Sequence, residues 1–242
     1  MARFFVDIEN ISDDEVCIIG DDVKHISRVL RMREGESITV CDKCGSDYEC
    51  TITQISSDVI KAKIDNKYPN SQEPPIHITI YQGLPKSDKM DYIVQKCIEL
   101  GAVRIVPVDT KRVVSKPKDI DKKISRWQKI AEEAAKQCGR GIIPQVSHLV
   151  KFADAIKEMT NSDAISLMPY ECERESRLKD ALALKSNTIN ILIGPEGGFD
   201  ESEVKAAKDA GLKTVTLGPR ILRTETAPIA TCTAVMYELG DW

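Results

Sequence analysis

The spacing of apolar residues changes once along the chain, near residues 66–75. Before this point, apolar and polar residues alternate in short stretches, as in β-strands with one buried face. Only the segment 21–31 departs from that alternation, because its apolar residues have helical spacing. The pattern predicts a small β-barrel-like domain that contains one short helix. Its predicted strands cover 3–6, 15–19, 36–41, 47–55 and 58–64.

The sequence NKYPNSQEPP at 66–75 marks a boundary between two domains. It holds three prolines among polar turn residues, and it has no apolar periodicity. Prolines and turn residues interrupt regular structure, so a linker is expected here. We therefore predict one domain over residues 1–70 and a second over residues 71–242.

After the boundary, apolar strand-like runs alternate with amphipathic helical stretches. This alternation predicts an α/β domain with a largely parallel sheet. Ligands of such domains bind outside the carboxyl ends of the strands. The predicted strands cover 77–83, 104–108, 164–169, 189–194 and 213–218. The predicted helices cover 87–101, 121–140, 175–184, 200–211 and a last segment that ends near Leu239.

Two of these helices have recognisable end signals. Ser87 is placed to cap the first one, and Gly101 follows it where a glycine often ends a helix. Asp200 and Glu203 have the spacing of a capping box. Gly211 is the expected stop of that helix.

The composition is that of a soluble globular protein. Hydrophobic residues make up 42% of the 242 residues and charged residues 30%. No apolar run approaches the roughly 18 residues of a membrane helix, and the N-terminus lacks the features of a secretory signal. We expect a cytoplasmic protein whose eight cysteines stay reduced.

No metal site is expected from the cysteines and histidines. Cys41 and Cys44 have the spacing of half a zinc site, but no second C-x-x-C exists to complete it. A hairpin turn that includes Asp42 and Gly45 is the favoured interpretation. The three histidines, at 25, 77 and 148, are dispersed.

The net charge of −4 argues against non-specific coating of nucleic acid, but basic residues are locally concentrated. One cluster contains Lys24, Arg28, Arg31 and Arg33. From these charges alone, polyanion binding and a plain solvated surface both stay open. A second cluster contains Arg104, Lys111, Arg112, Lys116, Lys118, Lys122, Lys123 and Arg126.

Two glycine-containing loops, 194–198 and 217–227, each follow an apolar strand and each lead into a helix. Neither has the lysine of a phosphate-binding P-loop or the glycine spacing of a dinucleotide turn. Glu196 would repel a phosphate group. The loops therefore suit a ligand that is neutral or cationic where it meets the backbone, although glycines can also serve a tight turn alone.

These two loops carry a family resemblance. LIGPEGGF, followed by LGPRILRTETA, resembles the SPOUT methyltransferase superfamily and, within it, the RsmE family of 16S ribosomal RNA (uracil-N3) methyltransferases. HISRVLRMREGE at 25–36, LPKSDKMDYIVQKCIELG at 84–101 and RWQKIAEEAAKQCGR at 126–140 extend the resemblance over nearly the whole chain. Two departures, Cys138 and the Cys41/Cys44 turn, do not touch the expected site.

The resemblance implies features that residue patterns could not supply. The domain 71–242 is expected to be a SPOUT domain whose parallel sheet carries a deep trefoil knot over about 189–227. The domain 1–70 is expected to be a PUA-like β-barrel that binds RNA. The cofactor implied is S-adenosylmethionine, and the partners are 16S ribosomal RNA in the small ribosomal subunit and a second copy of the chain.

The resemblance also implies roles for individual residues. The expected catalytic residues are Arg223, Arg140 and Glu196. The expected cofactor-binding residues are Leu192, Gly194, Pro195, Glu196, Gly197, Leu217, Gly218, Ile221, Leu222, Arg223, Thr226 and Ala227. The expected RNA-binding residues are Arg3, Arg28, Arg31, Lys86, Lys89, Arg112 and Arg126.

Uracil N3 carries a proton at neutral pH, so the enzyme needs a base or a cation that stabilises the uracil anion. Arg223 is the first candidate cation, with Arg140 and Arg112 as alternatives reaching from a partner subunit. Glu196 and Glu225 are candidate bases, but either could instead brace a loop. A ribose 2′-O-methyltransferase and a ribosome-binding protein without turnover are the competing interpretations.

Overall fold

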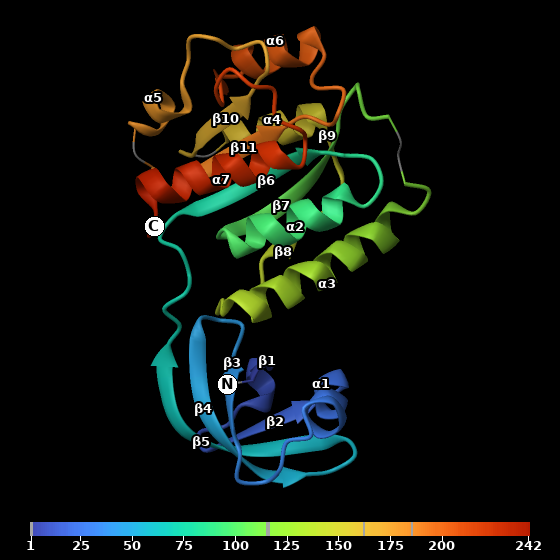
Figure 1. Ribbon diagram of the computed structural model, residues 1–242, viewed down its shortest axis with the longest axis vertical. Helices are drawn as coiled ribbons and strands as arrows, with labels where there is room; N and C mark the ends of the chain where they lie inside the picture. Colours follow the sequence, from blue (N-terminus) through green and yellow to red (C-terminus); the bar gives the residue numbers. More distant parts are fainter. Residues whose placement is uncertain (1, 115–116, 162, 185) are drawn as a thin grey trace. The chain divides into compact units, whose positions relative to one another are not determined.

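The computed structural model describes residues 2–114, 117–161, 163–184 and 186–242. It divides into two compact units (Figure 1). The first unit combines Met1–Glu73 with Ala135–Ile143, and the second combines Pro74–Ala134 with Pro144–Trp242. The segment Ala135–Ile143 therefore lies with the N-terminal part of the chain, which the sequence pattern did not indicate.

The first unit is built on a five-stranded sheet in the order β1-β3-β4-β5-β2. Its pairs are antiparallel except for β1 with β3, which run parallel. Alternate side chains such as Val16, Ile38 and Ile60 are fully buried in one core, as their alternation predicted. The strands are β1 (Arg3–Phe5), β2 (Glu15–Ile19), β3 (Ser37–Cys41), β4 (Ser46–Ile55) and β5 (Val59–Pro69).

Two details of this unit differ from expectation. Strand β5 continues to Pro69, so it occupies the start of the predicted linker. The predicted helix 21–31 is split into α1 (Asp21–Lys24) and a wider π-helical turn, His25–Val29. The π turn has more residues per turn than an α-helix and rotates later residues around the axis. As a result, Leu30 is 42% exposed instead of facing the core.

The second unit contains the predicted parallel sheet, in the order β12-β10-β11-β6-β7-β8, with β9 paired to β7. Every pair in it is parallel. This arrangement confirms the expected α/β fold class. The strands are β6 (His77–Gly83), β7 (Ala102–Asp109), β8 (Gln145–Val146), β9 (Val150–Lys151), β10 (Ile165–Pro169), β11 (Thr188–Ile193) and β12 (Lys213–Val215).

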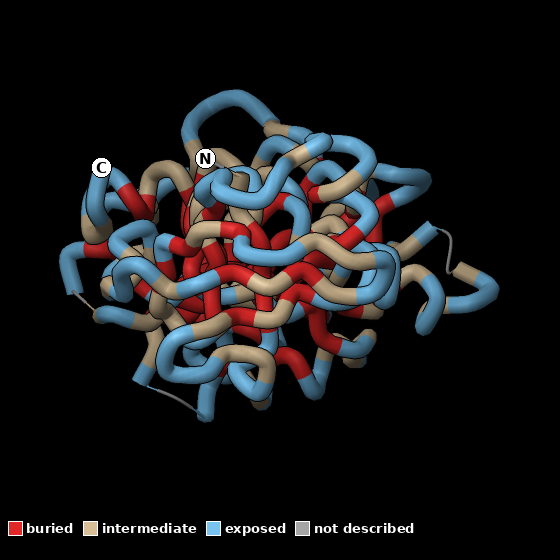
Figure 2. The backbone as a smooth tube through the Cα atoms, turned by 90° about the horizontal axis from the view of Figure 1, so that it is seen from below, coloured by how far each residue is buried: buried red, intermediate tan, exposed pale blue. Residues whose placement is uncertain are grey.

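Helices cover both faces of this sheet (Figure 1). Helices α4 and α6 pack on one face, around a core cluster that includes Tyr81, Leu192 and Phe199. Helices α2 and α7 pack against each other beside β7 and β11. Figure 2 shows the buried stretches inside and the exposed stretches in the peripheral loops. The helices are α2 (Lys89–Glu99), α3 (Ile120–Cys138), α4 (Phe152–Thr160), α5 (Leu178–Leu182), α6 (Glu201–Asp209) and α7 (Thr226–Leu239).

The predicted helix ends are correct in part. The capping box of α6 is present, with Asp200 and Glu203 making both hydrogen bonds. Gly101 has φ +95°, the left-handed conformation that ends a helix favourably with glycine. Ser87 does not cap α2, because the N-cap position is Asp88 and Ser87 itself adopts φ 56°.

Candidate functional site

The second unit has a pocket of about 380 Å³ at the carboxyl ends of β10, β11 and β12. This volume falls within the roughly 300–1,000 Å³ of small-molecule sites, and its place is where α/β sheets bind ligands. Three loops form its walls, together with Lys89 from α2. The lining residues are Lys89, Pro169, Tyr170, Glu171, Arg174, Ile193–Phe199, Thr216–Thr224 and Ala227.

The glycines of the pocket are required by backbone conformation and by packing. Gly218 has φ +106°, and no atom lies within 4 Å of the position that a Cβ would occupy. Its role is therefore to adopt a conformation that other residues rarely reach. A Cβ on Gly197 would lie 3.1 Å from Arg112 Cβ. Gly197 therefore allows the loop after β7 to pack closely against its backbone, in addition to any ligand.

A buried hydrogen-bond bridge joins the two glycine loops. The Thr224 hydroxyl donates to the Gly194 carbonyl at 2.7 Å, and the Gln82 side-chain amide donates to the Thr224 hydroxyl at 3.0 Å. Gln82 is fully buried at the end of β6, and Thr224 is 6% exposed. The bridge fixes the loop after β12 against the loop after β11.

A charged cluster lies beside this bridge. The Lys89 ammonium is 3.0 Å from Glu196 Oε1 and 3.0 Å from Glu225 Oε2. Burial acts to raise the pKa of Glu196, but hydrogen bonds from backbone N–H groups, with the nearby Lys89, outweigh it and lower the pKa. The same balance, with Arg223 contributing, lowers the pKa of Glu225. Both carboxylates are therefore ionised at neutral pH and are weak bases.

The third wall, residues 169–174, was not among the predicted site residues. Glu173 holds this loop by accepting hydrogen bonds from the Thr214 hydroxyl and from the backbone N–H groups of Arg174, Glu175 and Ser176. These bonds lower the pKa of Glu173 to about 2. The signal was available in the sequence, because this loop also follows the carboxyl end of a predicted strand.

Most of the expected cofactor residues line the pocket, but Leu192 and Thr226 do not. Leu192 is fully buried in the core on the face of α4 and α6. Its neighbour Ile193 lines the pocket in its place, because successive side chains of a strand point to opposite faces. Thr226 is the exposed first residue of α7.

The expected catalytic arginines lie in different units. Arg223 is exposed on the pocket wall. Arg140 belongs to the first unit, where it is 2% exposed and pairs with Glu73 at 2.8 Å. Its guanidinium therefore serves the packing of that unit.

Arg3, expected to bind RNA, is part of the same network in the first unit. Its guanidinium makes two hydrogen bonds to Asp47, at 2.6 and 2.9 Å, and donates to the Arg140 carbonyl at 2.9 Å. Only 14% of its side chain is exposed. Both terminal nitrogens of its guanidinium are thus engaged inside the protein.

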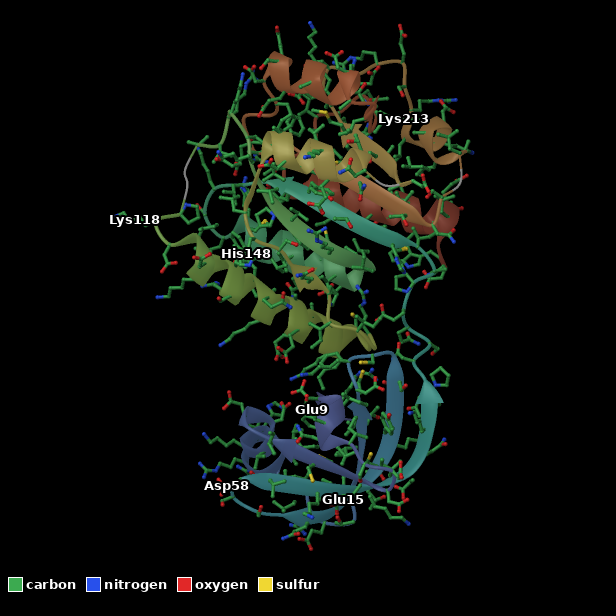
Figure 3. The ribbon with its side chains drawn as sticks, turned by 180° about the vertical axis from the view of Figure 1, so that it is seen from behind. Glu9, Glu15, Asp58, Lys118, His148 and Lys213 are labelled. Atoms are coloured by element: carbon green, nitrogen blue, oxygen red, sulfur yellow. The ribbon has the colours of Figure 1, made fainter. Side chains whose placement is uncertain are left out.

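The other expected RNA-binding residues lie mostly on the surface. Arg28, Arg31 and Lys86 are exposed. Arg126 pairs with Asp91, and Arg112 donates to the Gly197 carbonyl at 3.2 Å. Figure 3 shows Lys118, of the second basic cluster, pointing away from the second unit. Lys116 lies outside the described residues.

Among the described residues, no group of three or more histidine, cysteine or acidic side chains is arranged to hold a metal ion. Cys41 is the last residue of β3, and Cys44 lies in the hairpin turn between β3 and β4, as expected. His148 is exposed on the second unit (Figure 3). Within the part of the chain that the structure describes, no helix has the length and apolar character needed to cross a membrane.

Comparison with known proteins identifies the family. A profile described as an RNA methyltransferase domain matches residues 72–236, and one described as an RNA methyltransferase PUA domain matches residues 18–65. The ribosomal RNA small subunit methyltransferase E of Bacillus subtilis is 35% identical over 98% of this chain and 97% of its own length. The chain belongs to this family.

Solved structures agree with that assignment. The ribosomal RNA small subunit methyltransferase E of Neisseria gonorrhoeae, bound to S-adenosyl methionine, is 35% identical and superposes with a TM-score of 0.91 over 100% of this chain and 99% of its own. A methyltransferase of Legionella pneumophila, in complex with the same cofactor, is 26% identical, with a TM-score of 0.88 and the same coverage. The family expected from the two loop motifs is confirmed.

As a member of the methyltransferase E family, the chain combines a PUA domain in the first unit with a methyltransferase domain in the second. The profile of the methyltransferase domain ends at residue 236, within α7, so it contains all three loops of the pocket.

Proposed function

We propose that this protein transfers a methyl group from S-adenosylmethionine to N3 of a specific uridine of 16S ribosomal RNA in the small ribosomal subunit. The observation that carries the proposal is the pocket formed by the motif loops 194–198 and 217–224. A relative of 35% identity and nearly equal length is bound to S-adenosyl methionine. The protein would act in the cytoplasm, where its ribosomal substrate is found.

The pocket fits this cofactor chemically. S-adenosylmethionine supplies a methyl group on a cationic sulfonium and needs no phosphate site. The pocket contains the carboxylates of Glu171 and Glu196 and apolar side chains such as Leu217 and Ile221. Backbone groups of residues 194–198 and 217–222 would hold the cofactor, with Arg174 and Arg223 available for its carboxylate or for the substrate.

Arg223 is the residue proposed to stabilise the uracil anion. Loss of the N3 proton places negative charge on O2 and O4, and a guanidinium placed beside these oxygens stabilises that charge. The lowered pKa values of Glu196 and Glu225 argue against either acting as the general base. The pocket thus favours anion stabilisation by a cation over proton removal by a carboxylate.

The target nucleotide must leave its base pair, because N3 lies on the Watson–Crick edge. Exposed basic residues of both units are proposed to hold the surrounding phosphates. In the first unit these are Arg28 and Arg31, and in the second Lys86, Arg112 and Arg126. Arg3 is omitted because its guanidinium is buried against Asp47.

A homodimer is part of the proposal. Helix α7 is apolar along most of its length, and its small residues Ala230, Thr233 and Ala234 are only partly buried. On the same helix Tyr237 is 74% exposed. Small residues beside an exposed aromatic side chain allow close packing of a second copy, and interfaces are enriched in tyrosine.

Methylation of small ribosomal subunits, followed by reverse transcription, tests the function. An N3-methyl blocks Watson–Crick pairing, so the expected result is an enzyme-dependent stop at one uridine of 16S ribosomal RNA. Methyl incorporation without a stop would indicate the alternative, ribose 2′-O-methylation. Absence of incorporation into both subunits and free ribosomal RNA would favour another substrate or a binding role without turnover.

A further inference from the structure

Lys89 connects the two loops that carry the family motifs. It is the first residue of α2, and its ammonium forms one ion pair with Glu196 and one with Glu225. Glu196 follows β11, whereas Glu225 follows β12 and precedes α7. All three side chains are largely shielded, with exposed fractions of 28%, 24% and 23%. One partly buried cation therefore links segments that come from different strands.

The connection between β6 and α2 also braces the first of these loops without Lys89. The backbone N–H of Lys86 donates to Glu196 Oε1 at 3.0 Å. A Cβ on Gly83 would lie 2.7 Å from Pro195 Cδ, so the two backbones are packed as closely as glycine allows. Residues 83–86 thus hold the loop 194–198, and the Lys89 side chain extends this support to Glu225.

We propose that Lys89 is a positioning residue that sets the spacing of the two cofactor loops, and that it is not an RNA contact. Both carboxylate oxygens lie 3.0 Å from the same nitrogen, so without that cation two negative charges would face each other at short range. Repulsion between like charges would separate the loops. Glycine-containing loops have high conformational freedom, and ordering them on binding weakens affinity. This inference rests on the proposed function of the pocket.

The structure offers a matched pair of lysines for a test. Lys86 and Lys89 were both expected to contact RNA, yet Lys86 supports Glu196 through its backbone N–H and has an exposed side chain. K86M removes the same charge three residues away and leaves that N–H in place. K89R keeps the cation. E225Q removes the charge of one carboxylate that pairs with Lys89, at a residue that does not line the pocket.

Calorimetry with S-adenosylmethionine, and a filter-binding assay with a 16S ribosomal RNA fragment, are done on the full chain of each variant. K89M is expected to weaken cofactor binding about tenfold, equivalent to ~1.4 kcal/mol, with unchanged RNA affinity. K89R is expected to recover most of the cofactor affinity, and K86M to keep it. E225Q is expected to weaken cofactor binding, and the double variant K89M/E225Q to lose less than the sum of the two.

Each contrary result has one meaning. Absence of cofactor binding by the unaltered protein would contradict the proposed function. If the unaltered protein binds and K89M binds equally well, the positioning role is overturned. Weaker RNA binding by K89M with normal cofactor binding would make Lys89 an RNA contact. Additive effects of K89M and E225Q would mean that Lys89 acts on the ligand directly. Circular dichroism and thermal unfolding of every variant exclude misfolding as the cause.

Discussion

Arg223 is an exposed arginine on the pocket wall, and its proposed role depends on its charge. R223M is expected to reduce the methylation rate about 100-fold or more while cofactor binding changes little, because the charge matters when the uracil anion forms. Single-turnover methylation and calorimetry measure the two quantities. An equal loss in rate and in cofactor affinity would instead place Arg223 on the cofactor.

Thr224 has a different role, because its hydroxyl is a buried link between Gln82 and the Gly194 carbonyl. T224V has nearly the same shape but removes both hydrogen bonds. Loss of a buried hydrogen bond costs about 0.5–1.5 kcal/mol, so the free energy of unfolding and the cofactor affinity are both expected to fall. T224S retains the hydroxyl and is expected to behave almost as the unaltered protein in denaturant unfolding and calorimetry. If T224V had the same stability and cofactor affinity as the unaltered protein, the bridge would have no role in shaping the pocket.

At the scale of elements, alternation and helical spacing were sufficient to predict the long strands and helices. They failed for the shortest strands and for one irregular turn. Strands β8 and β9 have two residues each, too few to show alternation, and they were missed. Helix α4 was also missed, although its nine residues are amphipathic. The π turn after α1 cannot be distinguished by spacing from a continuous helix.

The residues of the candidate site were likewise predictable only in part. Backbone-lined positions such as Gly194 and Gly218 could be assigned because motif and strand end coincide there. The roles of Lys89 and Arg140 could not, because the partners of a charged side chain depend on tertiary packing. From the sequence alone, a lysine or arginine can be either a solvated surface charge or one partner of a buried ion pair.

The loop that contains Glu173 is an element whose stability depends on one carboxylate. A pKa lowered from 4.5 to about 2 means that the folded state favours the ionised form. The resulting stabilisation is complete above pH 4.5 and is lost as pH falls toward 2. E173Q is expected to lower stability at neutral pH by about 1 kcal/mol and to flatten the decline between pH 4.5 and 2. Urea unfolding at several pH values measures this, and parallel curves for the two proteins would contradict it.

For the whole molecule, the sequence predicted two domains and the structure shows two units, but the segment Ala135–Ile143 joins the first. No local sequence pattern indicates that a segment packs with a domain that is distant in sequence. The deep trefoil knot over 189–227 stays a prediction, carried by the family resemblance.

The network around Arg140 gives a prediction for the first unit. Glu73 accepts hydrogen bonds from the Arg140 guanidinium and from the backbone N–H groups of Gly141 and Ile142. E73A removes a carboxylate that accepts hydrogen bonds from a buried arginine and from two backbone N–H groups, and hydrogen bonds to a charged group are typically worth about 1.5–3 kcal/mol. E9A, at an exposed glutamate of the same unit (Figure 3), is expected to change stability by less than about 0.5 kcal/mol. Denaturant unfolding compares the two, and similar stabilities would show that the network contributes little.

The same segment has a consequence for how such a protein could have been assembled from older parts. Cys41 donates to the Gly141 carbonyl, and Asn70 donates to the Gly139 carbonyl, so side chains of the N-terminal part are hydrogen-bonded to residues encoded far downstream. A gene fragment that encodes only residues 1–73 would therefore lack the segment 135–143, which belongs to the same unit. Recombination that exchanged the N-terminal part alone would break these bonds, so the two stretches must diverge together, and substitutions at Glu73 and Arg140 should be correlated among descendants.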